Sequence, residues 1–444
     1  MNTVESPEVG LAQYLESNTD AREICVAYSG GMDSHALLHA VSALIGSDAH
    51  YAIRAIHINH GLQTCSDEWA DHCLEVCADL DIPLEVVNVR VVDQGDGPEA
   101  SARLARYAAF DQFLSDSEHI LLAQHADDQA ETFLLQALRG SGPDGLASIP
   151  RKRKFGRAFM ARPLLGCSRH SIETYAQNHG LSWVEDPSNN NNQYDRNFLR
   201  NEILPQLKSR WPAAAQTLSR AAMRCSAASQ TMLGLAQEDL ELVRVRGSAE
   251  LMVSELKSLP KERAFNVLRL WVRQAGLRMP RLQDLIQVHS DLIDARVDSQ
   301  GIVNVRDYEF RRYQDRLYLL PPQPAIAPFE YRWDQPFDEL YIAETGESLT
   351  RTRCAELGVA LPKNGSVVVR SRTGGELIKL GEPAFHKAVK KLLQESSVPP
   401  WEREAIPLLY VNDRLAAVWN IAVAIDFRVP ARTGTDSSID MEIA

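Results

Sequence analysis

Cysteine is scarce in this 444-residue sequence, which contains seven cysteines and no Cys-x-x-Cys pair. A small, odd number of cysteines argues against a disulfide framework and favours free thiols in a reducing compartment. His72, Cys73 and Cys77 lie close together in the sequence. They lack a second ligand pair at a usual spacing, so buried cysteines on a helix are favoured over a metal site.

Long apolar runs and excess positive charge are also missing. No uninterrupted stretch of about 20 apolar residues occurs, so no membrane span is expected. The N-terminal residues include acidic ones and no apolar run, unlike a signal peptide, and a cytoplasmic protein is therefore predicted. The chain carries 47 basic and 59 acidic side chains, a formal net charge of -12. This balance argues against a general nucleic-acid coat protein, so any nucleic-acid partner must bind local basic patches.

The first half of the chain alternates strand-like and helix-like segments. The apolar or β-rich runs are residues 23–28, 52–58, 84–92 and 119–123, and the helical segments are 34–45, 66–80, 99–114 and 127–139. Short buried strands separated by helices predict an α/β, doubly wound, Rossmann-like domain with a parallel sheet. In such sheets, ligands bind beyond the carboxyl ends of the strands.

The composition changes after Arg210-Trp211-Pro212. From there to about residue 273 no β-rich run occurs, which predicts an all-helical second region. Five prolines in residues 321–336 indicate a linker to a small mixed α+β domain. The predicted domains are residues 1–215, a mainly helical domain at 216–320 and a C-terminal domain at 337–432. The polar, acidic stretch 433–444 is expected to fray.

A glycine-rich string joins the first predicted strand to the first helix: Ser29-Gly30-Gly31-Met32-Asp33-Ser34. Two glycines permit a sharp turn, and the helix start that follows offers unpaired N–H groups to an anion. A carboxylate at Asp33 would repel phosphate directly but suits a Mg²⁺ that bridges to phosphate oxygens. The alternative is an ordinary capped turn, which the complete string in this context disfavours. No lysine follows the glycines, so this is not a Walker loop.

The string resembles the pyrophosphate loop, Ser-Gly-Gly-x-Asp-Ser, of the N-type ATP pyrophosphatase (PP-loop) superfamily. The resemblance implies that residues 29–34 bind ATP and that ATP is cleaved to AMP and pyrophosphate while a substrate oxygen is adenylated. It also implies that the end of the next strand contacts adenine through its backbone, at Ile56 and His57. Taken alone, His57 would be assigned to the core or to a loop.

Two further groups of charged residues lie at the expected ligand edge. Arg103 and Arg106 share one stripe of a predicted helix; they form either a solvated salt-bridged face or a contact for a polyanion. Asp127, Asp128 and Glu131 begin the helix that follows the 119–123 strand. Acidic residues often cap helix starts, but three carboxylates exceed that need and predict a metal or ammonium site.

The run from Gln124 to Gly145 is similar to the tRNA(Ile)-lysidine synthetase family, as are residues 183–189, 194–200 and 210–212. In the last third, residues 372–376, 390–395, 398–401 and 407–409 add to the resemblance. It implies three substrates: a tRNA(Ile) with a CAU anticodon, L-lysine and ATP. It implies that the wobble cytidine is adenylated at its C2 oxygen and that the side-chain amine of lysine then displaces AMP.

The resemblance and the residue chemistry together suggest roles for the charged side chains. Asp33 would hold Mg²⁺, and Asp128 and Glu131 would bind the ammonium groups of lysine. Arg196 or Arg200 would pair with the lysine carboxylate, since a guanidinium grips that group bidentately; the sequence does not decide between them.

Basic patches are the expected tRNA contacts. Residues 151–169 contain seven Lys or Arg and no acid, with Phe155 and Phe159 between them, a mixture suited to backbone contact and base stacking. The predicted tRNA-binding residues are Arg103, Arg106, Arg151, Lys152, Arg153, Lys154, Arg372, Lys390 and Lys391.

Three other functions fit the sequence less well. A tRNA thiolase commonly needs paired cysteines, and an amidating synthetase needs an ammonia-supplying domain with an N-terminal nucleophilic cysteine; neither is present. A non-catalytic RNA-binding or ATP-sensing protein would bind ATP without releasing pyrophosphate. Asp33, Asp128 and Glu131 argue against that alternative.

Overall fold

The computed structural model describes residues 6–61, 66–90, 98–185, 191–296, 301–322, 325–362, 367–381 and 385–429. The chain divides into two compact units, residues 1–234 and 235–444. Helix α10 (Ala214–Val243) contains the point of division. The three domain boundaries expected from the sequence remain predictions.

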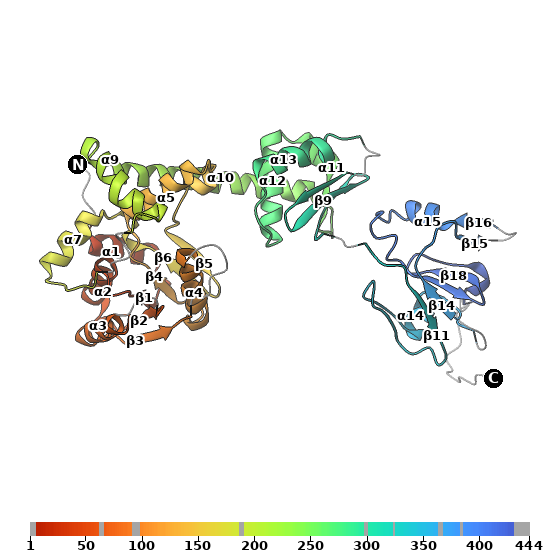
Figure 1. The fold of residues 1–444 in the computed structure, drawn as a ribbon, viewed down its shortest axis with the longest axis horizontal. Coiled ribbons are helices and arrows are strands. Elements are labelled where there is room, and N and C mark those ends of the chain that lie inside the picture. The colour runs from red at the N-terminus through yellow and green to blue at the C-terminus, as the bar shows by residue number, and fades with distance from the viewer. Residues whose placement is uncertain are drawn as a thin grey trace. The chain divides into compact units, whose positions relative to one another are not determined.

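The first unit contains a six-stranded sheet with the strand order β3-β2-β1-β4-β6-β5 (Figure 1). Its strands are β1 (Glu23–Ala27), β2 (Ala52–Asn59), β3 (Leu84–Asn88), β4 (His119–Leu121), β5 (Lys152–Phe155) and β6 (Ala158–Ala161). All neighbours are parallel except β5, which pairs with β6 as an antiparallel edge hairpin. The predicted α/β fold is therefore confirmed, with a hairpin that the basic composition of residues 151–157 had not indicated.

Helices cover both faces of this sheet. One apolar cluster joins the sheet to α1 (Pro7–Ser17), α2 (Met32–Ile45), α3 (Ser66–Asp79) and α7 (Arg169–Asn178), and a second joins it to α4 (Pro98–Phe113) (Figure 1). Strand β1 is buried on both sides: Ile24 and Val26 belong to the first cluster and Cys25 to the second. Because side chains alternate along a strand, a two-faced burial requires the continuous apolar run that the sequence shows.

The central strands place two loops at one edge of the sheet. Strands β1 and β4 are parallel neighbours, so the loop from β1 into α2 lies beside the loop from β4 into α5 (Ala126–Leu138). Helix α5 packs against α9 (Leu204–Arg210) and α10 through Ala130, Leu204 and Ala215. The shorter elements of this unit are α6 (Pro143–Leu146), η1 (Pro163–Gly166), α8 (Asp195–Phe198) and η3 (Leu199–Ile203).

The second unit begins with helices but also contains a sheet. Its first elements are α11 (Val253–Ser258), α12 (Lys261–Gln274), α13 (Leu282–Val288), η4 (His289–Ile293), β7 (Leu251–Met252), β8 (Ile302–Val305), β9 (Tyr308–Tyr313) and β10 (Arg316–Leu320). The four strands form one sheet in the order β7-β10-β9-β8. The region is mainly helical, as predicted, but the expectation that it is all-helical is wrong, because β7 precedes residue 273 and the three other strands follow it.

The remaining elements mix strands with short helices, as expected for the C-terminal part. They are β11 (Glu330–Trp333), β12 (Leu340–Ile342), β13 (Glu347–Leu349), α14 (Arg351–Glu356), β14 (Val367–Arg370), β15 (Leu377–Gly381), β16 (Phe385–Ala388), α15 (Val389–Glu395), β17 (Leu408–Val411), β18 (Arg414–Val418), β19 (Ala422–Val423) and η5 (Ile425–Phe427). Strand β11 pairs with β14, so the predicted linker is wrong from Glu330 onward. The stretch 433–444 lies outside the described residues.

Candidate active site

A cavity of about 640 Å³ opens at the carboxyl edge of the six-stranded sheet. Ligand pockets typically have such volumes. It brings together predicted site residues from five parts of the chain: Ser29, Asp33, Ser34, Ile56, His57, Arg103, Arg106, Asp128, Arg196 and Arg200. The cavity is therefore the candidate site, and it is lined by side chains at both ends of the glycine-rich loop and by one member of the predicted acidic cluster, Asp128.

The glycine-rich loop has the backbone that its sequence predicts. Gly30 has φ +81°, in the left-handed region that favours glycine, and a Cβ atom there would lie 3.2 Å from the Cys73 sulfur. Gly31 is the N-cap of α2, and no side chain caps the helix there. The first N–H groups of a helix have no intrahelical acceptor. Together with the helix dipole, they make the start of α2 a suitable seat for phosphate.

The hydroxyl groups of the loop hold its two ends together. The Ser29 N–H donates to Ser34 Oγ over 3.2 Å, and Ser34 Oγ donates to the Gly31 carbonyl over 2.9 Å. Met32 is buried in the apolar cluster below the loop. Met32 can therefore contact a nucleotide only through its backbone.

The two loop glycines should respond differently to alanine. We expect Gly30→Ala to lower the free energy of unfolding by about 1–2 kcal/mol, because a side chain is strained at positive φ, and to weaken ATP binding. Gly31→Ala should leave stability nearly unchanged, since φ is -78° and the nearest atom to a Cβ is Ser29 Oγ at 3.6 Å. It should still weaken ATP binding, since its methyl group lies beside the phosphate seat.

Denaturant unfolding and calorimetric ATP titration would test this pair. Gly140→Ala is the control, because Gly140 also has positive φ (+69°) but open space around a Cβ. If Gly31→Ala binds ATP as tightly as the unaltered protein, the start of α2 is not the phosphate seat.

Ile56 and His57, near the end of β2, line the cavity although their side chains are buried. Ile56 is 1% exposed and His57 is 5% exposed. His57 Nδ1 donates to the Tyr28 carbonyl over 3.0 Å. Burial lowers the pKa of this histidine, so the ring is neutral. The side chain of His57 is thus a core histidine, and only its backbone could contact adenine as predicted.

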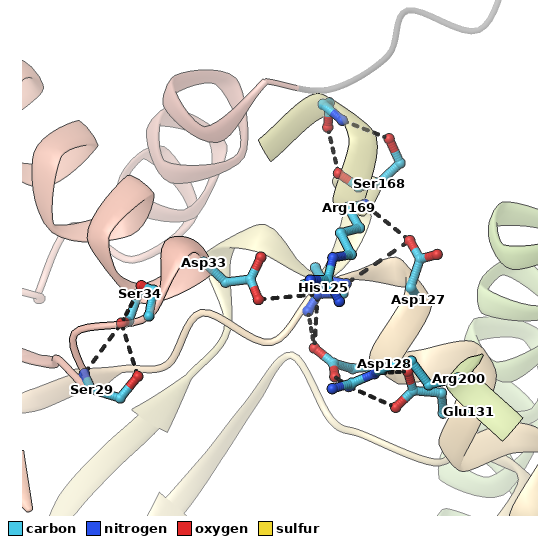
Figure 2. A network of polar contacts seen from close by, with 12 residues as sticks. Ser29, Asp33, Ser34, His125, Asp127, Asp128, Glu131, Ser168, Arg169 and Arg200 are labelled. Carbon is cyan, nitrogen blue, oxygen red and sulfur yellow. Dashed lines mark hydrogen bonds and ion pairs between the residues drawn. The ribbon is translucent and has the colours of Figure 1, made fainter. Parts of the chain in front are cut away.

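His125 occupies the centre of a polar network between the two loops (Figure 2). Its Nε2 lies 3.6 Å from Asp33 Oδ2 and 3.4 Å from Asp128 Oδ2. Burial by itself would lower the pKa of His125, but Asp128, Asp33 and Asp127 together raise it to about 9. The imidazolium therefore links the carboxylate after the glycine-rich loop to the carboxylate at the start of α5.

Asp127 does not belong to the cavity, and the prediction that it helps to bind metal or ammonium is wrong. Its Oδ1 pairs with Lys208, and its Oδ2 accepts the Arg169 N–H over 2.9 Å. Burial raises the pKa of Asp127, and these partners outweigh that effect and lower it. Asp127 joins α5 to α7 and α9, which is a structural role.

Asp33 is the residue that could hold a metal ion. Its Oδ1 is buried and has no hydrogen-bond partner among the described residues. Mg²⁺ is commonly held by only one or two carboxylates plus phosphate oxygens and water. Within the described ranges, no group of three or more His, Cys, Asp or Glu forms a metal site. The single orphaned oxygen of Asp33 thus fits an ion shared with a bound phosphate, not an all-protein cage.

Asp128 and Glu131 form a four-membered cluster with Arg196 and Arg200. Arg196 donates to Glu131 Oε2 over 2.8 Å and to Asp128 Oδ1 over 3.0 Å. Arg200 donates to Glu131 Oε1 over 2.7 Å and to Asp128 Oδ1 over 2.9 Å. Burial would raise the pKa of Asp128, but His125 and the two arginines lower it to about 2. Asp128 is therefore ionised, and both arginines donate to both acids.

Glu131 differs from its three partners in position. It is 1% exposed and does not line the cavity, whereas Asp128, Arg196 and Arg200 do. A buried carboxylate that accepts from two guanidinium groups fixes their orientation. The predicted direct contact between Glu131 and lysine has no support in this geometry.

The predicted tRNA contacts of the first unit fall into two groups. Arg103 and Arg106 line the cavity, with Arg103 over the Tyr107 ring at 4.7 Å. Arg151, Lys152, Arg153 and Lys154 lie on or beside the β5–β6 hairpin, outside the cavity lining. Arg151, Arg153 and Lys154 are exposed, whereas Lys152 donates to Asn18 Oδ1 over 2.7 Å.

The aromatic residues of the hairpin already contact other rings, and base stacking by them stays a prediction. Phe155 packs against Tyr107 with ring centroids 5.8 Å apart, and Phe159 packs against His119 at 5.0 Å. Arg162, which was counted in the basic patch, is 3% exposed. Its guanidinium is held by Gln124, the Pro150 carbonyl and the Met160 sulfur.

The predicted tRNA contacts of the second unit also differ in exposure. Lys390 and Lys391 are exposed on α15, beside the buried Leu392 and Leu393. The Arg372 side chain is only 15% exposed and lies 3.8 Å from Glu376. Glu376 accepts the Thr373 and Gly374 N–H groups, each over 2.6 Å. The 372–376 motif is thus a self-capped turn, and the two lysines are its more accessible neighbours.

The sequence assigned no role to three residues of the network, Gln124, His125 and Lys208, and it placed Arg162 only in the basic patch. His125 carried the clearest signal, because it directly precedes the acidic start of a helix and would meet any acid after the neighbouring strand. Lys208 and Arg162 carried none, since their partners lie 81 and 38 residues away in the chain. Cys73 and Cys77 are buried on α3, as expected for structural thiols, and Cys65 lies outside the described residues.

No helix within the described ranges is long and apolar enough to cross a membrane. Family models match three segments: a PP-loop domain at residues 5–207, a TilS substrate binding domain at 251–318 and a TilS substrate C-terminal domain at 367–437.

Curated relatives match almost the whole chain. A tRNA(Ile)-lysidine synthase from Coxiella burnetii is 37% identical, and the match covers 96% of this chain and 95% of the relative. The tRNA(Ile)-lysidine synthase from Alkalilimnicola ehrlichii is 41% identical over 95% and 94%, and that from Pectobacterium atrosepticum is 38% identical over 94% and 94%. With this identity over nearly the full length, and a PP-loop that opens into a cavity shared with a carboxylate–arginine cluster, the chain belongs to the tRNA(Ile)-lysidine synthase family.

Proposed function

We propose that this protein joins L-lysine to C2 of the wobble cytidine of a tRNA(Ile) with a CAU anticodon. ATP adenylates the C2 oxygen, pyrophosphate leaves, and the side-chain amine of lysine then displaces AMP. The observation that carries the proposal is the single cavity that joins the glycine-rich loop to the cluster of Asp128, Arg196 and Arg200. One site can thus hold a nucleotide beside an amino acid.

The loop side of the cavity supports the adenylation step. The cytidine C2 oxygen is a poor leaving group until it is bonded to AMP. The N–H groups at the start of α2 would bind the β- and γ-phosphates and stabilise the charge on the departing pyrophosphate. Mg²⁺ held by Asp33 would supply further charge neutralisation there.

The charged cluster supports lysine binding. Free lysine carries one carboxylate and two ammonium groups, so it can exchange ion pairs with a cluster that already contains both signs. Arg196 or Arg200 would take the lysine carboxylate, and Asp128 would take an ammonium group. Glu131 would keep the guanidinium groups oriented while their other donors turn to the ligand.

The attacking amine must lose a proton before it reacts, because free lysine has a side-chain pKa of about 10.4. Asp128 is the carboxylate of this cluster that lines the cavity. It is therefore the group placed to position the ammonium near C2, and with a pKa lowered to about 2 it holds this group rather than taking its proton.

The tRNA would be held by basic side chains at three places. Arg103 and Arg106 line the cavity, where the nucleotides next to the reacting base must pass. The exposed Arg151, Arg153 and Lys154 continue this surface on the hairpin, and Lys390 and Lys391 form another in the second unit. Phosphate contacts of this kind do not read sequence.

The decisive assay is pyrophosphate release from ATP with lysine and tRNA(Ile) transcripts that carry cytidine or uridine at the wobble position. We expect release to require the cytidine transcript, and labelled lysine to enter the RNA. Release that proceeds without lysine incorporation would contradict the proposed nucleophile. No release with any combination would reduce the protein to a binding module.

A further inference from the structure

Gln124 is a cavity residue to which the proposed chemistry assigns no role. It lies three residues after the end of β4, and β4 is on the side of β1 opposite to β2. Adenine is expected at the end of β2, beside Ile56 and His57. A group beyond β4 therefore faces the substrate side of the cavity, together with Asp128.

The orientation of the Gln124 amide is determined by Arg162. Arg162 Nε lies 2.5 Å from Gln124 Oε1, and the other guanidinium nitrogens donate to the Pro150 carbonyl over 2.9 Å and the Met160 sulfur over 3.1 Å. A guanidinium only donates, so the amide atom that faces it must be the oxygen. The Gln124 amide cannot flip without leaving a buried charge without its acceptor.

The other end of the amide is available to a ligand. Among the described residues, Gln124 Nε2 has no hydrogen-bond acceptor. It is also absent from the buried polar atoms that lack a partner, so this nitrogen is accessible. Gln124 lines the cavity, so its NH₂ group is within reach of a molecule in the site. The cavity therefore contains an uncharged hydrogen-bond donor, and Arg162 fixes the orientation of its amide.

A donor of this kind can distinguish cytosine from uracil at one ring position. N3 of cytosine is an acceptor, whereas N3 of uracil carries a hydrogen and is a donor. The O2 atoms are acceptors in both bases, and at position 4 a donor would favour uracil. A donor that favours cytosine must therefore face N3.

We propose that Gln124 selects the wobble cytidine by donating to N3 of the base, with Arg162 as the residue that positions its amide. This inference rests on the proposed function, because it assumes that a cytidine is the base in the cavity. It assigns base selection to a side chain distinct from the groups that bind ATP and lysine.

Exchange of Gln124 for glutamate tests the proposal, because glutamate has the same shape and pairs with Arg162 but only accepts hydrogen bonds. We expect kcat/KM for pyrophosphate release with the cytidine transcript to fall roughly 10-fold or more. The uridine transcript, used as a competitive inhibitor, should bind about 10-fold more tightly, since its N3–H meets an acceptor. Gln124→Met removes the donor together with the oxygen that accepts from Arg162, and it should weaken only the cytidine transcript.

Controls separate base reading from charge and folding. Gln136→Glu introduces the same charge on α5, outside the cavity lining and with its acceptor still bonded to the Ser141 hydroxyl; it should keep the selectivity of the unaltered protein. Arg162→Lys should reduce selectivity when Gln124 is present and have no further effect on it in Gln124→Met. Thermal unfolding and ATP affinity are measured for every variant.

The outcomes distinguish a failure of base selection by Gln124 from a failure of the proposed function. If the unaltered protein prefers the cytidine transcript and Gln124→Glu keeps the same ratio between transcripts, the inference is wrong and the proposed function stands. If the unaltered protein releases pyrophosphate with neither transcript, the proposed function fails and base selection by Gln124 fails with it.

Discussion

Replacement of Asp33 by asparagine should lower the turnover of pyrophosphate release about 1,000-fold. The carboxylate has one oxygen near the His125 imidazolium and one buried oxygen without a partner among the described residues. Asparagine keeps the shape but removes the charge that would hold Mg²⁺ beside the phosphates. Binding of tRNA, measured by filter retention, should change by less than about 2-fold. The change at Asp33 leaves the exposed basic side chains that would contact the tRNA phosphates unaltered.

Asp127→Asn is the matched control for this variant. Asp127 also lies near His125, at 3.9 Å, but it is outside the cavity and serves to join helices. This change should lower the free energy of unfolding while most of the turnover per folded molecule is retained. Equal losses of turnover in the two variants would mean that Asp33 acts through His125 and holds no metal ion.

The second large effect is expected at Glu131. Glu131→Gln leaves Arg196 and Arg200 with only Asp128 as a carboxylate partner, and removal of one member of a buried ionic cluster costs about 3 kcal/mol of unfolding free energy. Because the guanidinium groups are then less well oriented, the KM for lysine should rise about 100-fold, since a small misplacement costs that much. ATP affinity should be retained, because Glu131 does not line the cavity.

Urea unfolding and lysine-dependent incorporation kinetics would measure both effects. Glu202→Gln is the comparison: Glu202 is an exposed residue near Arg200 in the chain and accepts a hydrogen bond from the Asn192 amide. Its unfolding free energy should change by less than about 0.5 kcal/mol. If Glu131→Gln is as stable as this comparison variant and keeps its KM for lysine, the cluster does not position the lysine site.

The parts of the site that are local in sequence could be predicted, and those that depend on distant contacts could not. The string 29–34 contains the turn, the helix start and the carboxylate within six residues. Asp128 and Glu131 share a face through their spacing on one helix. Arg196 and Arg200 donate to acids that lie 65 to 72 positions away in the sequence, so no local pattern indicates these ion pairs.

The missed sheet of the second unit has a physical explanation in strand β9. Its sequence, Tyr-Glu-Phe-Arg-Arg-Tyr, shows no apolar run, yet Glu309 and Arg312 are 4% and 3% exposed. Arg312 is buried because it donates to the carbonyls of Leu292 and Ala295, and Glu309 because it accepts from Arg311. Charged residues that are buried together with their hydrogen-bond partners hide a buried strand from any hydropathy pattern.

The glycine-rich loop is also tied to a segment about 150 residues further along the chain. The Val184 N–H donates to the Gly30 carbonyl over 2.9 Å, and His35 Nδ1 donates to the Ser182 carbonyl over 2.7 Å. Synthesis on the ribosome proceeds from the N-terminus, so the loop emerges long before the groups that anchor it. A nascent chain therefore cannot complete its nucleotide site until residue 184 has left the exit tunnel. A fragment that ends before residue 182 contains the complete glycine-rich string but lacks the backbone groups that anchor it.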